Sequence, residues 1–491
     1  MGGSPPKGGF SWRFRLLRRL SPRSLPLGMR RHAMRRRSRS LCLGLLLVVS
    51  LLLAAMPAQA GHETDPHTKN LRPIGHTDDN RPVTSFFDPF FTDVAFWGKF
   101  AVQGIWFGGF RVIDISSPTR PRVLSEVDCG AFQGDVGVWG DLVFRSVDAP
   151  VAATTPEETC DAPLAEAGFE GIQIFRVDDP AHASADDLIT AVGTDCGSHT
   201  HTVVPDPKHH RVLIYVANSG TEPAYGPDPN FGNQCSETHG KFQIIEVPLK
   251  APERARVIRD VTLGPAGGPP VANSCHDIGV LMNGHRRLAV CAGEVATVHD
   301  ITNPARPRFV TSFTTQGVTS WHSAALSWDG RVTVMGWEPG GGVAPECEAS
   351  DPDLNKSVFF FDTFSGELLG TWVLPRPQSA VENCTIHNYN VVPTGKRDVL
   401  VMGNYQAGTW VVDFTNPRHA RTVAWSDPPP LDPANLTLGG AWGSYWYNGS
   451  IYETNITEGL NIFRLRSRVT AGARRLPFLN PQSQVGRVKV D

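Results

Sequence analysis

The sequence predicts an all-β protein, and in particular a seven-bladed β-propeller. One short apolar phrase returns seven times, at intervals of about fifty to seventy residues, which is the length of a four-stranded sheet with its loops. Glycine and proline are abundant, at 48 and 40 residues, which suits many short strands joined by tight turns. Helical periodicity is almost absent after the first sixty residues. Each sheet alone would expose an apolar face, and stacking around a ring covers it.

The recurring phrase is a run of β-branched or aromatic residues, usually with an acidic residue and often followed by a proline. It occurs at residues 110–118, 172–180, 242–248, 296–304, 358–362, 409–417 and 460–465. Such runs favour strands, and we predict that each phrase is the third strand of a blade and that the segment after its proline is the fourth. The first two strands precede the phrase, joined by hairpin turns such as Asn283-Gly284 and Asn448-Gly449.

The last blade lacks a fourth strand in the expected place, because the phrase at 460–465 is followed by arginine and serine residues. The segment 70–76 resembles the strands that follow the prolines elsewhere. We predict that it pairs into the last blade and closes the ring, which leaves no free sheet edge there. The propeller would then span residues 69–466, with a leader at 61–68 and a polar tail at 467–491.

Residues 1–60 have the pattern of a signal peptide. A block of arginines at 30–39 precedes an apolar run at 41–56, and Ala58-Gln59-Ala60 offers the small residues that signal peptidase reads. The apolar run is shorter than the roughly twenty residues of a membrane span. We therefore expect cleavage after Ala60 and a secreted or cell-surface monomer without a membrane span; an uncleaved anchor is the alternative. The net charge of −2 argues against nucleic acid as a partner.

Eight cysteines remain after the signal segment, and an even number in an exported chain predicts disulfides. Cysteines just before a blade's first strand and cysteines in the long loops after a second strand should lie on the same face of a propeller. A further two lie symmetrically about a hairpin turn. The predicted pairs are Cys129–Cys160, Cys196–Cys235, Cys347–Cys384 and Cys275–Cys291.

Aligning the first strands of the blades places a histidine at one equivalent position in four of them. First strands begin at the mouth of the central channel, so we predict that these imidazoles converge there. Neutral imidazole is a common ligand of transition metals, and we expect copper or iron if a metal is bound. Histidines that pack around water without a metal fit the same pattern, because repeats copy residues. The four residues are His199, His276, His322 and His387.

Metal-binding histidines usually need a partner for the second ring nitrogen. We expect this role for three aspartates in or beside the aligned first strands, namely Asp277, Asp135 and Asp93. His201 should point to the same side of its strand as His199 but one pleat deeper, and we expect it to be structural. Glu294, Glu338 and Glu382 fall near strand ends, where they could serve as bases or be solvated loop charges.

The phrases at 110–118 and 409–417 resemble the LVIVD repeat, which gives its name to a family of exported bacterial β-propellers. The similarity runs from about Asn70 to Arg464 and implies an architecture rather than an activity. A four-histidine centre on a propeller axis also resembles the iron-dependent carotenoid oxygenases and the metal-dependent selenium-binding-protein/methanethiol-oxidase group. That likeness extends only to the four aligned histidines, so it implies no substrate and no reaction.

These patterns favour a propeller that binds a small-molecule or protein ligand on one face. A copper- or iron-dependent oxidoreductase at the channel mouth is the alternative, and a structural envelope or adhesion protein is a third interpretation. The sequence has no glycine-rich phosphate loop, no Gly-x-Ser-x-Gly elbow and no His-Glu-x-x-His motif, so the corresponding enzyme classes are not indicated.

Overall fold

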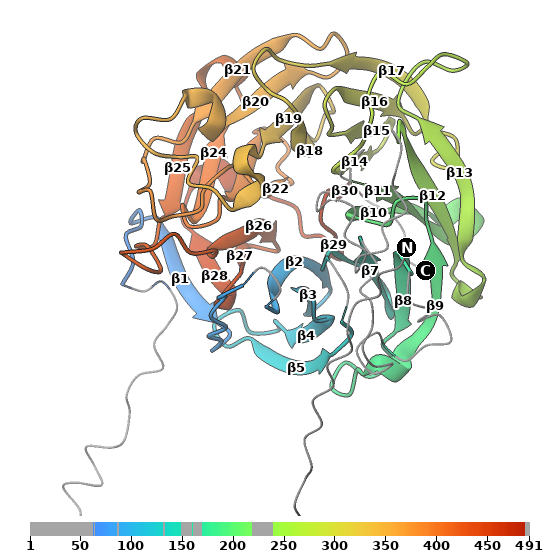
Figure 1. Cartoon of the computed structure of the whole chain (residues 1–491), viewed down its shortest axis with the longest axis horizontal. Coiled ribbons are helices and arrows are strands. Elements are labelled where there is room, and N and C mark those ends of the chain that lie inside the picture. The colour runs from blue at the N-terminus through green and yellow to red at the C-terminus, as the bar shows by residue number, and fades with distance from the viewer. Residues whose placement is uncertain are drawn as a thin grey trace, which may run out of the picture. The chain divides into compact units, whose positions relative to one another are not determined.

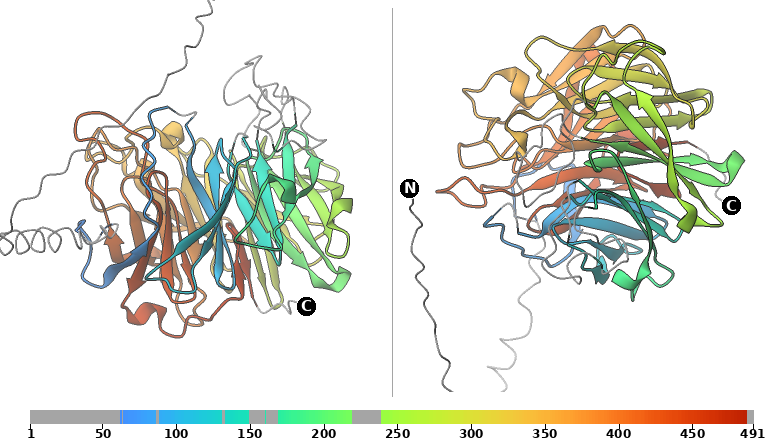
Figure 2. Two further views of the ribbon diagram at one scale, coloured as in Figure 1. Left: turned by 90° about the horizontal axis from the view of Figure 1, so that it is seen from below. Right: turned by 45° about the vertical axis from the view of Figure 1, so that its right-hand side comes forward.

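The computed structural model describes residues 62, 64–85, 88–130, 133–148, 160, 169–218 and 239–486. The predicted signal peptide at 1–60 and Cys235 lie outside these residues. Within the described chain, the strands form seven four-stranded antiparallel blades, two of which are joined in one eight-stranded sheet. The blades stand around a common axis (Figure 1). Seen from the side in Figure 2, their strands run from one face of the ring to the other. The predicted all-β propeller is confirmed.

The blades follow one another in chain order. Blade 1 contains β2 (Phe90–Trp97), β3 (Phe100–Trp106), β4 (Phe110–Asp114) and β5 (Arg122–Val127). Blade 2 contains β6 (Val136–Trp139), β7 (Leu142–Val147), β8 (Gly171–Arg176) and β9 (Leu188–Gly193). Blade 3 contains β10 (Thr200–Asp206), β11 (Arg211–Ala217), β12 (Lys241–Pro248) and β13 (Arg256–Thr262).

The remaining blades repeat this order, and each of the seven recurring phrases supplies a third strand. Blade 4 contains β14 (Ile278–Asn283), β15 (Arg286–Cys291), β16 (Ala296–Asp300) and β17 (Arg308–Phe313). Blade 5 contains β18 (Trp321–Leu326), β19 (Val332–Trp337), β20 (Ser357–Asp362) and β21 (Leu368–Val373). Blade 6 contains β22 (Asn388–Val391), β23 (Val399–Gly403), β24 (Thr409–Asp413) and β25 (Arg421–Ser426). Blade 7 contains β26 (Ala441–Tyr447), β27 (Ser450–Asn455), β28 (Gly459–Leu465) and β1 (Leu71–His76).

The strand at the amino end closes the ring. β1 pairs antiparallel with β28, from Leu71 opposite Leu465 to His76 opposite Asn461, so that the two ends of the propeller share one sheet. Figure 1 shows the two strands side by side. This is the closure that the sequence predicts for residues 70–76. Blades 6 and 7 are also joined, by a short parallel pairing of Asn388 with Gly443 and of Tyr389 with Ser444.

In the described residues, helical structure is confined to short 3₁₀ turns in the loops. These are η2 (Ala185–Asp187), η3 (Pro207–His209), η4 (Pro252–Arg254), η5 (Pro339–Gly342), η6 (Asp353–Lys356), η7 (Pro417–His419) and η8 (Arg468–Thr470). Among the described residues, no helix is long and apolar enough to span a membrane.

The acidic residue of the recurring phrase has a structural task. In blade 1, Asp114 accepts a hydrogen bond from the backbone N–H of Ser116 at 2.9 Å, which shapes the turn, and one from Arg122 at 2.8 Å, which ties the turn to the fourth strand. The same arrangement, with an arginine eight residues after the aspartate, occurs in blades 4 and 6, at Asp300–Arg308 and Asp413–Arg421. The repeat therefore encodes the turn between the third and fourth strands.

Replacing Asp114 by alanine should lower the free energy of unfolding by about 1 kcal/mol, since the change removes the turn's acceptor and an exposed ion pair. Hydrogen bonds from Ser116 and Arg122 lower the pKa of Asp114 to about 2. The stabilisation should therefore be present at neutral pH and decrease as the pH falls from about 4 toward 2. Urea unfolding at pH 7 and pH 3 measures both effects. Equal stability of the variant and the native chain at pH 7 would contradict this role.

The segment after blade 7, which the sequence analysis assigns to a polar tail at 467–491, reaches the centre of the ring. Two short strands, β29 (Phe478–Leu479) and β30 (Ser483–Val485), lie there in Figure 1. β29 pairs with the end of β2, and β30 runs parallel to β14, with Val280 opposite Ser483. Residues 478–485 of this segment thus pair with inner strands of the ring rather than forming a tail outside the fold.

Between and beside these two strands, polar side chains of the segment bond to the inner strands of other blades. The amide of Asn480 accepts from the N–H of Val138 at 2.7 Å and donates to its carbonyl at 3.0 Å. Gln484 makes the same two contacts with Leu326, at 2.8 and 2.7 Å. Ser483 donates to the carbonyl of Val203 at 2.9 Å. Residues 478–485 thereby contact the inner strands of five blades; we call them the carboxy-terminal belt.

Candidate functional site

The four aligned histidines come from equivalent places in blades 3 to 6. In three of them the backbone N–H of the histidine bonds to the end of the second strand in its own blade: His199 to Ala217 at 2.9 Å, His276 to Ala292 at 2.5 Å, and His387 to Gly403 at 3.2 Å. His322 lies within the first strand of blade 5. The shared backbone geometry of the repeat therefore presents four imidazoles at one end of the channel.

The four rings form a row. The ring centres of His199 and His276 are 4.3 Å apart, those of His276 and His322 are 4.0 Å apart, and those of His322 and His387 are 4.5 Å apart. Residues that are far apart in the sequence are thus in contact, as the alignment of first strands predicts. All four side chains are buried or mostly buried.

A carboxylate lies against the row. Glu338 follows β19, and its Oε2 is 3.4 Å from Nε2 of His322, while its Oε1 is 3.6 Å from Nε2 of His387. The Tyr405 hydroxyl donates a hydrogen bond to Oε1 at 2.6 Å. Gly342, four residues after Glu338, has a φ of 71°, and a Cβ there would collide with the Tyr405 hydroxyl. The loop can pack this closely because position 342 is glycine.

One compact group with the geometry of a metal site results. Ligand atoms of His276, His322 and Glu338 all lie within 4.8 Å of one another. This group differs from the predicted four-histidine set, since a carboxylate joins two of the histidines while His199 and His387 flank them. Glu338, which the sequence places only near a strand end, is the residue that changes the expected chemistry.

Three of the four rings are oriented by what their Nδ1 atoms contact, whereas Nδ1 of His322 has no hydrogen-bond partner. Nδ1 of His199 is 2.8 Å from Oδ2 of Asp148, and Nδ1 of His276 is 3.2 Å from Oδ1 of Asp277. Nδ1 of His387 bonds to the carbonyl oxygen of Trp442. Such contacts fix the tautomer and leave Nε2 available to a ligand.

Of the three aspartates expected to support the histidines, only Asp277 does so. Asp135 accepts from the backbone N–H of His201 at 2.7 Å and also lies 3.1 Å from its Nδ1. Asp93 bonds to Asn388 at 2.8 Å and to the hydroxyl of Tyr445. Both predictions are wrong because these aspartates lie deeper in the channel, where they bond to neighbouring inner strands.

The sequence contained a signal for the supporting carboxylates that the alignment of first strands missed. Asp148 directly follows β7, and Glu338 directly follows β19, so they occupy equivalent positions after the second strands of blades 2 and 5. In each case the carboxylate contacts the histidine of the next blade, His199 or His387. Aligning second strands as well as first strands would have identified both.

Burial determines the charge of the row. It lowers the pKa of His276, it lowers that of His322 well below the usual value, and it lowers that of His387 to about 3, so these rings are neutral at pH 7. Burial alone would also lower the pKa of His199, but the carboxylate of Asp148 raises it. Burial raises the pKa of Glu338 to about 7. A cation that entered the row would therefore meet three neutral imidazoles and one buried carboxyl group.

The histidines face a pocket with a volume of about 80 Å³, which is room for several water molecules or a small group of a ligand. Its polar wall contains the four histidines, Glu338, Asp93 and Asp135. Its other wall is aromatic and is formed by Phe90, Trp106, Tyr405 and Trp442. The rings of Phe90 and Trp106 are stacked with centres 5.2 Å apart, and Trp442 packs edge-on against His387 at 4.7 Å.

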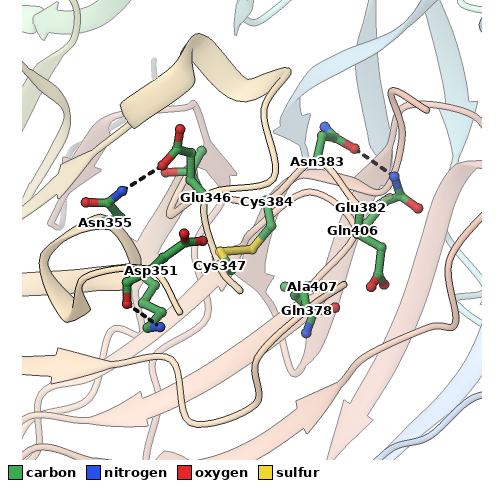
Figure 3. Close-up of a disulfide and its surroundings, with 12 residues drawn as sticks. Glu346, Cys347, Asp351, Asn355, Gln378, Glu382, Asn383, Cys384, Gln406 and Ala407 are labelled. Carbon is green, nitrogen blue, oxygen red and sulfur yellow. Dashed lines mark hydrogen bonds between the residues drawn. A yellow bond between two sulfur atoms is a disulfide. The ribbon is translucent and has the colours of Figure 1, made fainter. Parts of the chain in front are cut away.

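Disulfides fix the chain close to the histidines. Cys347–Cys384, drawn in Figure 3, ties the loop that carries Glu338 to the segment that leads to His387. Asn383, beside it, accepts from Gln406 at 2.9 Å. Cys275–Cys291 spans a hairpin next to His276, and Cys129–Cys160 is also formed. Three of the four predicted pairs are thus formed, and the fourth includes Cys235, outside the described residues.

Fold and site together define the class: a seven-bladed β-propeller with a buried histidine and carboxylate cluster at one end of its channel. A family model for the LVIVD repeat matches residues 92–129, and the chain therefore carries an LVIVD repeat. No curated protein is significantly similar to the chain.

Two solved structures to which the chain is similar have low identity and low TM-scores. The computationally designed Ika8 protein is 10% identical, with a TM-score of 0.39 over 80% of this chain and 99% of that one. A chain of the mitotic checkpoint complex is 11% identical, with a TM-score of 0.43 over 80% of this chain and 96% of that one.

Proposed function

We propose that the protein binds one transition-metal ion in the pocket, with His276, His322 and Glu338 as its ligands, and that the metal contacts a small-molecule ligand there. The observation that carries the proposal is the convergence of three potential ligand atoms, from two blades, to within 4.8 Å of one another. Two neutral imidazoles and a carboxylate are good ligands for such an ion. The flanking histidines lie beside these ligands, His199 next to His276 and His387 next to Glu338.

Iron is the metal that this donor set favours. Two histidines and one carboxylate with open positions are typical of non-haem iron(II) sites, while copper also accepts imidazole ligands. A bound iron or copper ion would supply one-electron and dioxygen chemistry to a molecule in the pocket. A metal-dependent oxidoreductase is therefore the second candidate function, and it is favoured by the open space on the pocket side of the cluster.

The chain's own residues would perform binding and orientation. The aromatic wall offers apolar surface to a ligand, and Tyr405 holds Glu338 through its 2.6 Å hydrogen bond. Asp277 and Asp148 hold two of the histidines. The carboxy-terminal belt contacts five inner strands of the channel, so we propose that ligands enter from the histidine end.

Export is part of the proposal. Disulfides persist in oxidising compartments, and three of the predicted pairs lie wholly among the described residues, two of them close to the site. Together with the signal-like amino terminus, they support a protein that works outside the cytoplasm.

Elemental analysis of the purified protein tests the metal. We expect close to one iron or copper ion per chain, and a loss of that ion when Glu338 is changed to glutamine, which keeps the size of the side chain. His299→Ala is the matched control, because His299 is a buried histidine on β16 whose Nε2 is 3.1 Å from the hydroxyl of Thr297. Protein without iron or copper after reconstitution with either metal would overturn the proposal and leave a metal-free ligand pocket.

A further inference from the structure

A second group of potential metal ligands lies at blade 7, where β1 closes the ring. His62, from the segment before β1, packs against blade 7 with its ring centre 5.7 Å from that of Phe463. It meets Glu453 of β27, Glu458 of the following turn and Asn461 of β28. The side chains of His62, Glu453 and Asn461 are almost fully buried, whereas that of Glu458 is 37% exposed.

The polar atoms of this group converge on one point. Nε2 of His62 is 3.2 Å from Oε1 of Glu453 and 3.0 Å from Oε2 of Glu458. The amide nitrogen of Asn461 is 2.7 Å from the same Nε2 and within 3.1 Å of both carboxylate oxygens. Ligand atoms around a zinc ion at about 2.0 Å in a tetrahedron are separated by about 3.3 Å, close to these distances.

The orientation of His62 matches that of a metal-bound histidine. Its Nδ1 lies 2.5 Å from Oδ2 of Asp65, which holds the ring with Nε2 facing the cluster. A carboxylate behind a histidine in this way fixes the ring and makes its other nitrogen a stronger ligand.

Two observations indicate that a cation is needed here. Three carboxylates, those of Asp65, Glu453 and Glu458, contact a single imidazole, and that of Glu453 is fully buried, so the group holds more negative charge than one imidazolium compensates. In addition, the buried Oδ1 of Asn461 has no hydrogen-bond partner. Turning that amide by 180° exchanges its oxygen and nitrogen at nearly the same shape, and places an oxygen at the centre of the group as a fourth ligand.

We propose that His62, Glu453, Glu458 and Asn461 bind a divalent cation of the zinc class. The ion joins the amino-terminal segment to β27 and β28, next to the place where β1 completes blade 7. It therefore closes the ring more firmly, since a cation that binds only the folded chain stabilises it. The site is separate from the pocket histidines and does not depend on the function proposed for them.

The test uses zinc itself and the full chain. The purified protein is stripped with EDTA, and zinc binding is measured by competition with a coloured chelator. To distinguish this site from zinc bound in the histidine pocket, the measurement is made in the native chain and in a chain that carries both His322→Ala and Glu338→Gln. We expect one zinc ion that persists in the second chain and is lost on His62→Ala and on Glu458→Gln. His76→Ala, a histidine of β1 outside the group, should keep it.

Thermal unfolding gives the second readout. At a zinc concentration a hundred times the dissociation constant, the ratio of folded to unfolded chain should rise about 100-fold. Glu458→Gln should fold without zinc, because Glu458 is partly exposed, and should lose this gain. Zinc binding and zinc stabilisation that are unchanged in Glu458→Gln, or their absence from the native chain, would overturn the site.

Discussion

Replacing His322 by alanine should reduce the affinity of the pocket for iron or copper by more than about a hundredfold, because loss of a residue that merely supports a ligand already costs 10- to 100-fold. His322 lies in the middle of the row, 4.0 Å from the ring of His276 and 4.5 Å from that of His387, and its Nε2 faces Glu338. Its removal takes one ligand from the centre of the group.

The effect on folding should be smaller than the effect on the metal. Nδ1 of His322 is buried without a hydrogen-bond partner, so the alanine variant breaks no hydrogen bond of that atom. Metal titration monitored by absorbance, together with a thermal melt, separates the two effects. The His299→Ala control should show the reverse pattern, with unchanged metal affinity and a lower melting temperature. A His322→Ala variant that keeps native affinity would exclude His322 as a ligand.

A chain that ends at Leu476 should be much less stable than the full chain. The deletion exposes the surfaces against which Phe478, Leu479 and Val485 are buried, and it removes partners from five inner strands. Phe478 alone contacts Trp97 and Trp139, with ring centres 5.2 and 4.9 Å away. After the ordering entropy of the segment is subtracted, we expect a loss of about 5 kcal/mol in the free energy of unfolding.

Denaturant unfolding of the full and shortened chains measures this loss. A double variant, Asn480→Ala with Gln484→Ala, removes the amide bonds to Val138 and Leu326 but keeps the three apolar side chains, and should show an intermediate loss. If the shortened chain unfolds at the same denaturant concentration as the full chain, the carboxy-terminal belt is not part of the folded core.

The parts of the fold that could be predicted are those the repeat encodes locally. A third strand, its aspartate and the arginine eight residues later are close in sequence, so the pattern at 110–118 predicts both the strand and the turn that Asp114 shapes. Ring closure by residues 70–76 followed from counting strands. The contact of His199, His276, His322 and His387 followed from placing their strands in register, since equivalent positions in a closed ring face one axis.

The ligand set of the pocket could not be obtained from the register of the first strands alone. Glu338 begins a loop, and whether its carboxylate reaches His322 depends on how that loop packs on Tyr405 and on the disulfide Cys347–Cys384. The aspartates Asp93 and Asp135 were assigned to the wrong partners, because alternation along a strand gives the side a residue faces but not its depth in the channel.

By itself the sequence determined the seven blades, the strand that closes them and the alignment of four histidines, because the recurring phrase marks each blade and shows which blade lacks a strand. Only the tertiary structure decided that Glu338 completes the cluster, that residues 478–485 line the channel and that His62 meets Glu453. Each of these contacts involves a loop or a terminal segment outside the recurring strands, and it forms because buried polar atoms and apolar side chains must find partners that no local pattern specifies.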